Sequence, residues 1–306
     1  MIYNFKMAFL NKTIGIIGLG MLGSKIAERL LDRKISINIY NRDKTKLKNF
    51  ENHNIKSVDN PCALANECDF IITCVTNFES LKDIFFSEQG IIECKKENLI
   101  VADCSTISPD ESIYCSKLLK EKGIILLSAP VLGGPTDAKN GELISIISGD
   151  KESFNKVNNI FEIFSKHIFY LGENNGLSSS LKIALNLNIA IISLALAEGI
   201  ILSKHSGIDP TIFLKILNLS KFKTSISENK GQKMLNNDFT PSFYLKNMLK
   251  DLDLATRLSD SLQISLPITK SSQQLFQEAS HDENLKNKDY SAIFYFLNEH
   301  ANKNKK

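Results

Sequence analysis

The chain has 306 residues, 37 Lys and Arg against 34 Asp and Glu, and a formal net charge of +3. A hydrophobic fraction of 43% is enough for a buried core, and the small net charge argues against a nucleic-acid-binding protein. Six cysteines without a CxxC pair favour buried free thiols over a disulfide framework or a metal site. The segment Met1–Leu10 lacks a signal-peptide pattern, and the longest apolar run is about half a membrane span, so we expect a soluble, cytoplasmic protein.

The most informative stretch is Thr13–Gly23, an apolar strand that ends on a GxGxxG turn and opens a helix. Three glycines at this spacing allow a tight turn, close approach of the backbone to a pyrophosphate, and packing of the helix on the strand. A second strand at Ile35–Tyr40 completes a βαβ unit. The residues expected to hold the pyrophosphate are Gly18, Leu19, Gly20, Met21, Leu22 and Gly23.

The second strand runs into Asn41-Arg42, where an NAD enzyme usually has an acidic residue for the ribose hydroxyls. A guanidinium group binds a 2′-phosphate, whereas a carboxylate repels it. The sequence therefore predicts NADP(H) as the cofactor, with NAD possible.

Strand-like and helix-like segments alternate as far as Leu171 and predict a mostly parallel, doubly wound Rossmann sheet. After Gly172–Gly176 no further strand is evident. A long helix at Leu181–Lys204 follows, then Pro210–Leu219 and shorter helices broken by Gly231, Pro241 and Pro267. We expect an α/β Rossmann domain over residues 1–173, joined by the long helix to an all-helical domain for substrate binding and oligomerisation over residues 174–306. The segments expected in the first domain, after the βαβ unit, are strands at Asp69–Val75, Asn98–Cys104, Ile124–Ala129, Glu142–Ser148 and His167–Leu171 and helices at Pro61–Glu67, Glu79–Phe86, Pro109–Lys120 and Lys151–Phe164.

Four more segments carry polar groups suited to chemistry. Ser105-Thr106 follows a strand at the sheet edge where open α/β folds bind ligands, although a helix cap is the simpler interpretation. Gly133-Gly134 can present bare amides to a carboxylate, or simply form a turn. Lys182 and Asn186 share one face of the long helix. Phe243, Lys250-Asp251 and Asp289–Ala292 follow. A lysine in an apolar turn loses hydration, which lowers its pKa and makes it a usable proton donor, whereas a surface lysine is the alternative.

Together these motifs, in this order, resemble the β-hydroxyacid dehydrogenase family over residues 12–298. Phe169–Gly172, Ala197–Gly199, Phe243 and Asn41-Arg42 are similar to its glyoxylate/succinic semialdehyde reductase branch.

The resemblance implies a role for each matching residue. Lys182 would be the catalytic general acid, and Asn41 with Arg42 would hold the 2′-phosphate. Other cofactor contacts would be Thr106 and Lys250 near the nicotinamide. The substrate would contact Ser105, Gly133, Gly134, Asn186, Phe243 and Asp251. No metal is expected.

Two positions depart from the family pattern: Leu132 stands where many members have serine, and Ser178 stands where many have a second glycine. The sequence thus predicts an NADPH-dependent reductase of small aldehydes or keto acids that acts as a homodimer or homotetramer. A 3-hydroxyisobutyrate dehydrogenase or related 3-hydroxy acid dehydrogenase is the alternative enzyme. A non-catalytic cofactor-binding protein is the remaining alternative, although Lys182 and Asn186 are both present.

Overall fold

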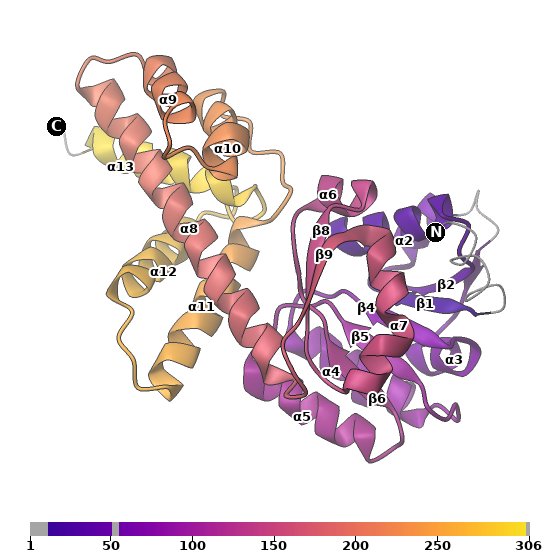
Figure 1. The fold of residues 1–306 in the computed structure, drawn as a ribbon. Coiled ribbons are helices and arrows are strands. Elements are labelled where there is room, and N and C mark those ends of the chain that lie inside the picture. The colour runs from indigo at the N-terminus through magenta and orange to yellow at the C-terminus, as the bar shows by residue number, and fades with distance from the viewer. Residues whose placement is uncertain (1–11, 51–54, 304–306) are drawn as a thin grey trace. The chain divides into compact units, whose positions relative to one another are not determined.

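The computed structural model describes residues 12–50 and 55–303, so the expectation for Met1–Leu10 lies outside the described residues. The chain divides into two compact units, Met1–Lys182 and Ile183–Lys306, called below the Rossmann unit and the helical unit (Figure 1). The long helix α8 (Gly176–His205) contributes its first two turns to the Rossmann unit and the rest to the helical unit.

The Rossmann unit is built on a six-stranded parallel sheet in the order β3-β2-β1-β4-β5-β6. Its strands are β1 (Ile14–Ile17), β2 (Ile37–Tyr40), β3 (Lys56–Ser57), β4 (Phe70–Thr73), β5 (Ile100–Asp103) and β6 (Ile125–Ser128). The chain order reverses beside β1, and open α/β sheets bind ligands at the carboxyl ends of the strands flanking such a point. This confirms the predicted doubly wound Rossmann sheet.

Helices cover both faces of this sheet. Along β1, Ile14 and Ile16 belong to one core cluster with Phe161 of α7, whereas Ile17 belongs to a second cluster with Leu64 of α3. The alternation follows from the period of two in a strand, so a sheet buried on both faces needs apolar residues at successive positions. The helices are α2 (Met21–Asp32), η1 (Lys44–Phe50), α3 (Pro61–Glu67), α4 (Phe78–Phe86), η2 (Ile91–Glu93), α5 (Pro109–Lys120), α6 (Pro135–Asn140) and α7 (Lys151–Phe164).

A second sheet of three strands continues the Rossmann unit. It consists of β7 (Val131–Leu132), β8 (Leu143–Ile147) and β9 (Ser165–Tyr170), with β8 antiparallel to β7 and parallel to β9. A bridge between Ser128 and Ser148 joins the end of β6 to the end of β8. The sequence did not predict β3, β7 and α6, which are two to six residues long.

Every named element in residues 183–303 is helical, as the sequence predicts. After α8 come α9 (Pro210–Leu219), α10 (Ser225–Leu235), α11 (Leu245–Ser261), α12 (Pro267–Ser280), η3 (Tyr290–Ala292) and α13 (Ile293–Lys303). The core of this unit includes Leu245, Met248 and Phe276, which are almost completely buried.

Two expectations for these helices were wrong. Gly231 lies inside α10 instead of ending a helix, and a Cβ there would come within 2.4 Å of Leu214 on α9, so the glycine allows the two helices to pack closely. Helix α8 begins at Gly176, five residues before the expected start. By length and composition alone α8 also qualifies as a membrane-spanning helix, a test that the core helix of a soluble protein passes as well.

Candidate active site

The glycine turn after β1 has the geometry that a dinucleotide requires. Gly18 has φ +94°, and a Cβ there would lie 2.2 Å from the carbonyl oxygen of Cys74. A Cβ at Gly23 would lie 2.0 Å from the carbonyl oxygen of Gly18. Gly20 differs, because a Cβ there would meet nothing within 4 Å. Two glycines thus allow close packing, and the third leaves open space in front of the helix.

Helix α2 begins at this open space. Its N-cap residue is Gly20, which provides no side-chain cap, and its first turn (Met21–Ser24) contains no acidic residue. The first backbone N–H groups of a helix have no partner within the helix and attract anions. The open space at Gly20 and the uncapped helix start fit the pyrophosphate of a dinucleotide.

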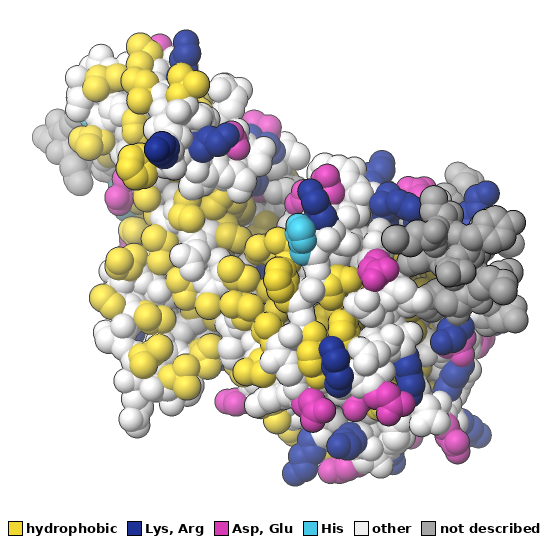
Figure 2. All heavy atoms as spheres, in the orientation of Figure 1, with side chains coloured by type: hydrophobic (Ala, Val, Ile, Leu, Met, Phe, Trp, Pro, Cys, Tyr) yellow, Lys and Arg dark blue, Asp and Glu magenta, His cyan; other side chains and the backbone are white. Residues whose placement is uncertain are grey.

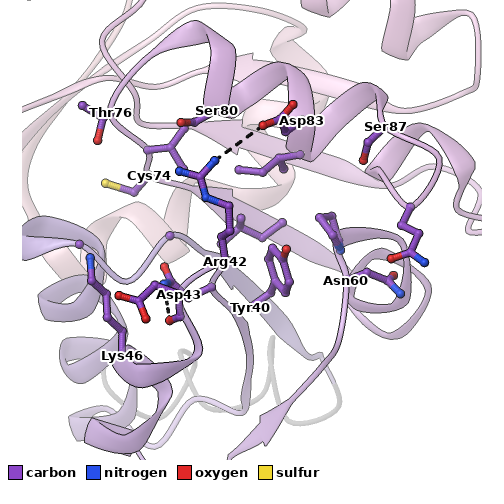
Figure 3. A pocket seen from close by; sticks show the side chains of 18 residues that line it. Tyr40, Arg42, Asp43, Lys46, Asn60, Cys74, Thr76, Ser80, Asp83 and Ser87 are labelled. Atoms are coloured by element: carbon purple, nitrogen blue, oxygen red, sulfur yellow. Dashed lines mark hydrogen bonds and ion pairs between the residues drawn. The ribbon is translucent and has the colours of Figure 1, made fainter.

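A groove extends from the glycine turn along the ends of β2 and β4 to the start of α3 and to α4. Figure 3 shows Arg42 reaching across it towards Ser80 and Asp83 of α4. The Arg42 guanidinium lies 3.7 Å from the Asp83 carboxylate, and about four-fifths and three-quarters of the two side chains are exposed. The residues lining the groove include Gly18, Gly20, Tyr40, Asn41, Arg42, Asp43, Lys46, Asn60, Cys74, Thr76, Ser80, Asp83 and Ser87.

Asn41 and Arg42 lie together at this groove but have different surroundings. The buried Asn41 side chain accepts a hydrogen bond from the Leu19 N–H at 2.8 Å and donates one to the Asp43 carbonyl at 2.8 Å. It therefore holds the glycine turn against the end of β2. Arg42, by contrast, extends into the groove. Of the two lysines just beyond, Lys44 lies against the carbonyl oxygens of Val58 and Asp59, whereas Lys46 lines the groove.

Sequence reasoning missed several groove residues, Asp83 and Cys74 among them, because they lie on other elements. Burial, together with a smaller effect of the nearby Asp103 carboxylate, raises the pKa of the Cys74 thiol to about 12, so the thiol stays protonated near neutral pH. The one signal in the sequence for Cys74 is its position directly after β4, since strand ends meet at this edge.

Ser105 follows β5 and lies in a buried hydrogen-bond cluster. Its hydroxyl donates to Asp103 Oδ1 at 2.6 Å and accepts from the Val75 N–H at 3.0 Å. The Thr73 hydroxyl donates to the same Asp103 oxygen at 2.7 Å. Ser105 thus ties the loop after β5 to the loop after β4, and the half-buried Thr106 comes next in the chain.

The paired glycines follow β7. Gly133 is exposed with φ +128°, whereas the Gly134 N–H donates to the Asp137 carboxylate at 2.7 Å and starts helix α6. The Gly134 amide is therefore already a donor to the protein itself. Leu132 is half-buried in β7 opposite Ile144.

Lys182 is the last residue of the Rossmann unit and is buried, with 9% of its surface exposed. In the helical unit, Asn186 donates to Asp251 Oδ2 at 2.5 Å, and the Lys250 ammonium lies 2.8 Å from Asp251 Oδ1. Asp251 is 1% exposed. Three predicted site residues are thus brought together, with Asp251 bridging the amide and the ammonium group.

Phe243 lies beside a buried ion pair that sequence reasoning did not find. Asp289 is completely buried, and both its oxygens accept hydrogen bonds from Lys230, at 2.8 and 2.9 Å. Burial opposes the charge of Asp289, but Lys230 and hydrogen bonds from Ser242 and Ser291 hold the pKa of this carboxyl below its usual value. The Phe243 N–H also donates to Asp289, at 3.3 Å, so the ion pair fixes the Phe243 backbone.

Comparison with known proteins identifies the family. The family profile for the NAD binding domain of 6-phosphogluconate dehydrogenase matches residues 13–172, and the profile for NAD-binding of NADP-dependent 3-hydroxyisobutyrate dehydrogenase matches residues 176–297. The chain belongs to the β-hydroxyacid dehydrogenase family. As a member, it is an NAD(P)-dependent oxidoreductase that acts on CH–OH or carbonyl groups.

Relatives and solved structures agree with this assignment. Among β-hydroxyacid dehydrogenases, the chain is 30% identical to the chloroplastic glyoxylate/succinic semialdehyde reductase 2 of Arabidopsis thaliana, over 93% of this chain and 79% of the relative. Reductase 1 of the same plant is 27% identical over 92% and 96%. The crystal structure of a 3-hydroxyisobutyrate dehydrogenase from Salmonella typhimurium superimposes with a TM-score of 0.86 at 23% identity, over 94% of this chain and all of that one, and shows the shared fold.

Proposed function

We propose that this β-hydroxyacid dehydrogenase is an NADPH-dependent reductase of small aldehydes or keto acids, of the glyoxylate/succinic semialdehyde type. The observation that carries the cofactor preference is Arg42, whose guanidinium extends into the groove beside the glycine turn. An arginine is the side chain best suited to a 2′-phosphate. The reductase names of two relatives that match more than nine-tenths of this chain support the direction and the substrate class.

The reaction needs one hydride and one proton. NADPH, when bound, supplies the hydride to the carbonyl carbon. The Lys182 ammonium donates a proton to the carbonyl oxygen as it gains negative charge, which gives the alcohol and leaves a neutral lysine that regains a proton from solvent. The burial of Lys182 supports this role, because a charged group shielded from water interacts more strongly with a developing alkoxide.

The other proposed site residues bind and orient the substrate or the cofactor. Asn186 is held by Asp251, so its amide has a fixed direction. Lys250, paired with the same carboxylate, is proposed as a cofactor contact near the nicotinamide. Asp251 itself, Ser105, Gly133, Gly134 and Phe243 complete the proposed substrate set. Of the two glycines, Gly133 is the better candidate to donate its N–H to a substrate carboxylate, because the Gly134 N–H already donates to Asp137.

A substrate screen tests the proposal. NADPH oxidation is followed at 340 nm with glyoxylate, succinic semialdehyde and other short aldehydes, and NADP+ reduction with 3-hydroxyisobutyrate and related hydroxy acids. We expect turnover with an aldehyde or keto acid and a higher kcat/KM with NADPH than with NADH. Turnover with 3-hydroxyisobutyrate alone would instead support the 3-hydroxy acid dehydrogenase named by the second family profile.

We also propose that the protein forms a cytoplasmic homodimer or homotetramer. Figure 2 shows hydrophobic side chains spread over one face of the helical unit. On α9, Ile212, Ile216 and Leu219 are exposed and share one side of the helix, a pattern typical of a surface that packs against a partner. Light scattering should give a multimeric mass that falls for Ile216→Glu and not for Lys215→Glu, a neighbouring residue that is also exposed. A monomeric native protein would contradict this proposal.

A further inference from the structure

Four buried serines lie in the first turn of helix α8 or against it. Ser128 ends β6, Ser148 follows β8, and Ser178 and Ser179 lie in the helix. All four side chains are at most 3% exposed. We call them the serine cluster.

Ser178 is at the centre of the serine cluster. Its hydroxyl lies 2.7 Å from the Ser148 hydroxyl, 2.8 Å from the Ser128 hydroxyl and 3.1 Å from the Ser128 carbonyl oxygen. The Ser178 N–H donates to the Ser148 hydroxyl at 3.2 Å, and the Ser179 and Ser128 hydroxyls are 3.2 Å apart. One helix turn is therefore bonded to both sheets of the Rossmann unit.

Asn175 anchors the chain just before the helix. Its carbonyl oxygen accepts from Ser148 at 3.0 Å and from Ser112 of α5 at 3.3 Å. Its side-chain amide donates to the Leu126 carbonyl of β6 at 2.8 Å, and its side-chain oxygen accepts from Ser116 at 3.0 Å. The start of α8 is thus fixed by bonds to β6, α5 and the end of β8.

Lys182 lies four residues after Ser178, one turn along the same side of the helix. Apolar packing is non-directional and permits small rotations of a helix, whereas several hydrogen bonds to one buried hydroxyl fix both rotation and axial position. We propose that Ser178 is a positioning residue that sets the location of the Lys182 ammonium relative to the Rossmann unit. This inference rests on the proposed role of Lys182 as the proton donor.

The variant Ser178→Ala tests the proposal, with Ser145→Ala as the matched control. Ser145 of β8 is also completely buried in the Rossmann unit, and its hydroxyl lies 2.6 Å from that of Ser165 of β9. Both variants lose a buried hydroxyl, so both should lower the unfolding temperature, and Ser178→Ala should lower it more because its hydroxyl has more partners. For Ser178→Ala we expect kcat to fall about tenfold and the midpoint of its pH profile to shift, with the NADPH dissociation constant from fluorescence titration unchanged. Ser145→Ala should keep kcat within about twofold.

A double variant shows whether Ser178 acts through Lys182. Ser178→Ala added to Lys182→Ala should not slow the residual rate further, because the group to be positioned is gone. If Ser178→Ala matches the control in kcat, or slows the Lys182→Ala protein by the same factor as the native one, the positioning role is overturned. Near-native kcat in Lys182→Ala alone would overturn the proposed function as well. Should Ser178→Ala fail to fold, Ser148→Ala removes the same contact from the sheet side and carries the same expectations.

Discussion

Replacing Arg42 by alanine should remove most of the preference for NADPH. In the structure the guanidinium is about four-fifths exposed and pairs with Asp83 at 3.7 Å. An exposed pair of this kind contributes about 0–1 kcal/mol, so releasing Arg42 from Asp83 when the cofactor binds costs little free energy. A charge-assisted bond to the 2′-phosphate contributes about 1.5–3 kcal/mol, which corresponds to a loss of about 10- to 150-fold in kcat/KM for NADPH.

The assay compares kcat/KM for NADPH and NADH in the native protein, in Arg42→Ala and in Arg33→Ala. Arg33 is exposed at the end of α2 and does not line the groove, so its loss controls for the change in net charge. NADH, which lacks the phosphate, should be used equally well by all three proteins. An equal loss for both cofactors, or a change of less than twofold for NADPH, would refute the assignment of Arg42 to the phosphate.

Three further predictions concern other residues. Asp83→Asn should raise NADPH affinity a few-fold, measured by fluorescence titration, because a carboxylate that competes for Arg42 and repels the phosphate is removed; unchanged affinity at low salt would contradict this. Leu132→Ser should shift the kcat/KM ratio from succinic semialdehyde towards glyoxylate by about fivefold, because the longer aldehyde loses apolar contact with the leucine that is worth about 1 kcal/mol for each buried methylene. An unchanged ratio would show that Leu132 does not contact the substrate. Asp289→Asn should cost about 3–5 kcal/mol of unfolding free energy by leaving Lys230 unpaired, whereas Asp209→Asn at an exposed helix cap should cost almost nothing. Because folding lowers the pKa of Asp289, its contribution to the free energy of unfolding is complete above about pH 4 and is lost as the pH falls through the folded-state pKa. The unfolding temperatures of Asp289→Asn and Asp209→Asn should therefore converge as the pH is lowered.

The parts of the fold that the sequence predicts well are those with local signals. Helix α5 covers the expected residues Pro109–Lys120, and its start is marked locally by Pro109 in the first turn and by the N-cap Ser108, which forms a capping box with Glu111. Helix α9 likewise begins after Asp209, whose side chain accepts from the Thr211 N–H. The strands β1, β4 and β5 are apolar at nearly every position because both faces of the sheet are covered.

The parts that the sequence does not predict depend on contacts distant in the chain. The glycine in α10 looks like a helix end until Leu214 of α9 is placed against it. The short strand β7 exists because β8 pairs with it. Nothing in the sequence near Asn41 indicates that its side-chain oxygen accepts a hydrogen bond from the Leu19 N–H, 22 residues earlier. The same holds for Lys230 and Asp289, which are 59 residues apart.

The proton-donor role of Lys182 is most directly tested by measuring NADPH binding and turnover together in Lys182→Ala. Lys204→Ala, an exposed lysine of the same helix, is the control. We expect Lys182→Ala to bind NADPH with the native dissociation constant and to reduce the best aldehyde about 10²- to 10⁴-fold more slowly, as the loss of a general acid requires. A Lys182→Ala protein that turns over at the rate of Lys204→Ala would contradict the account.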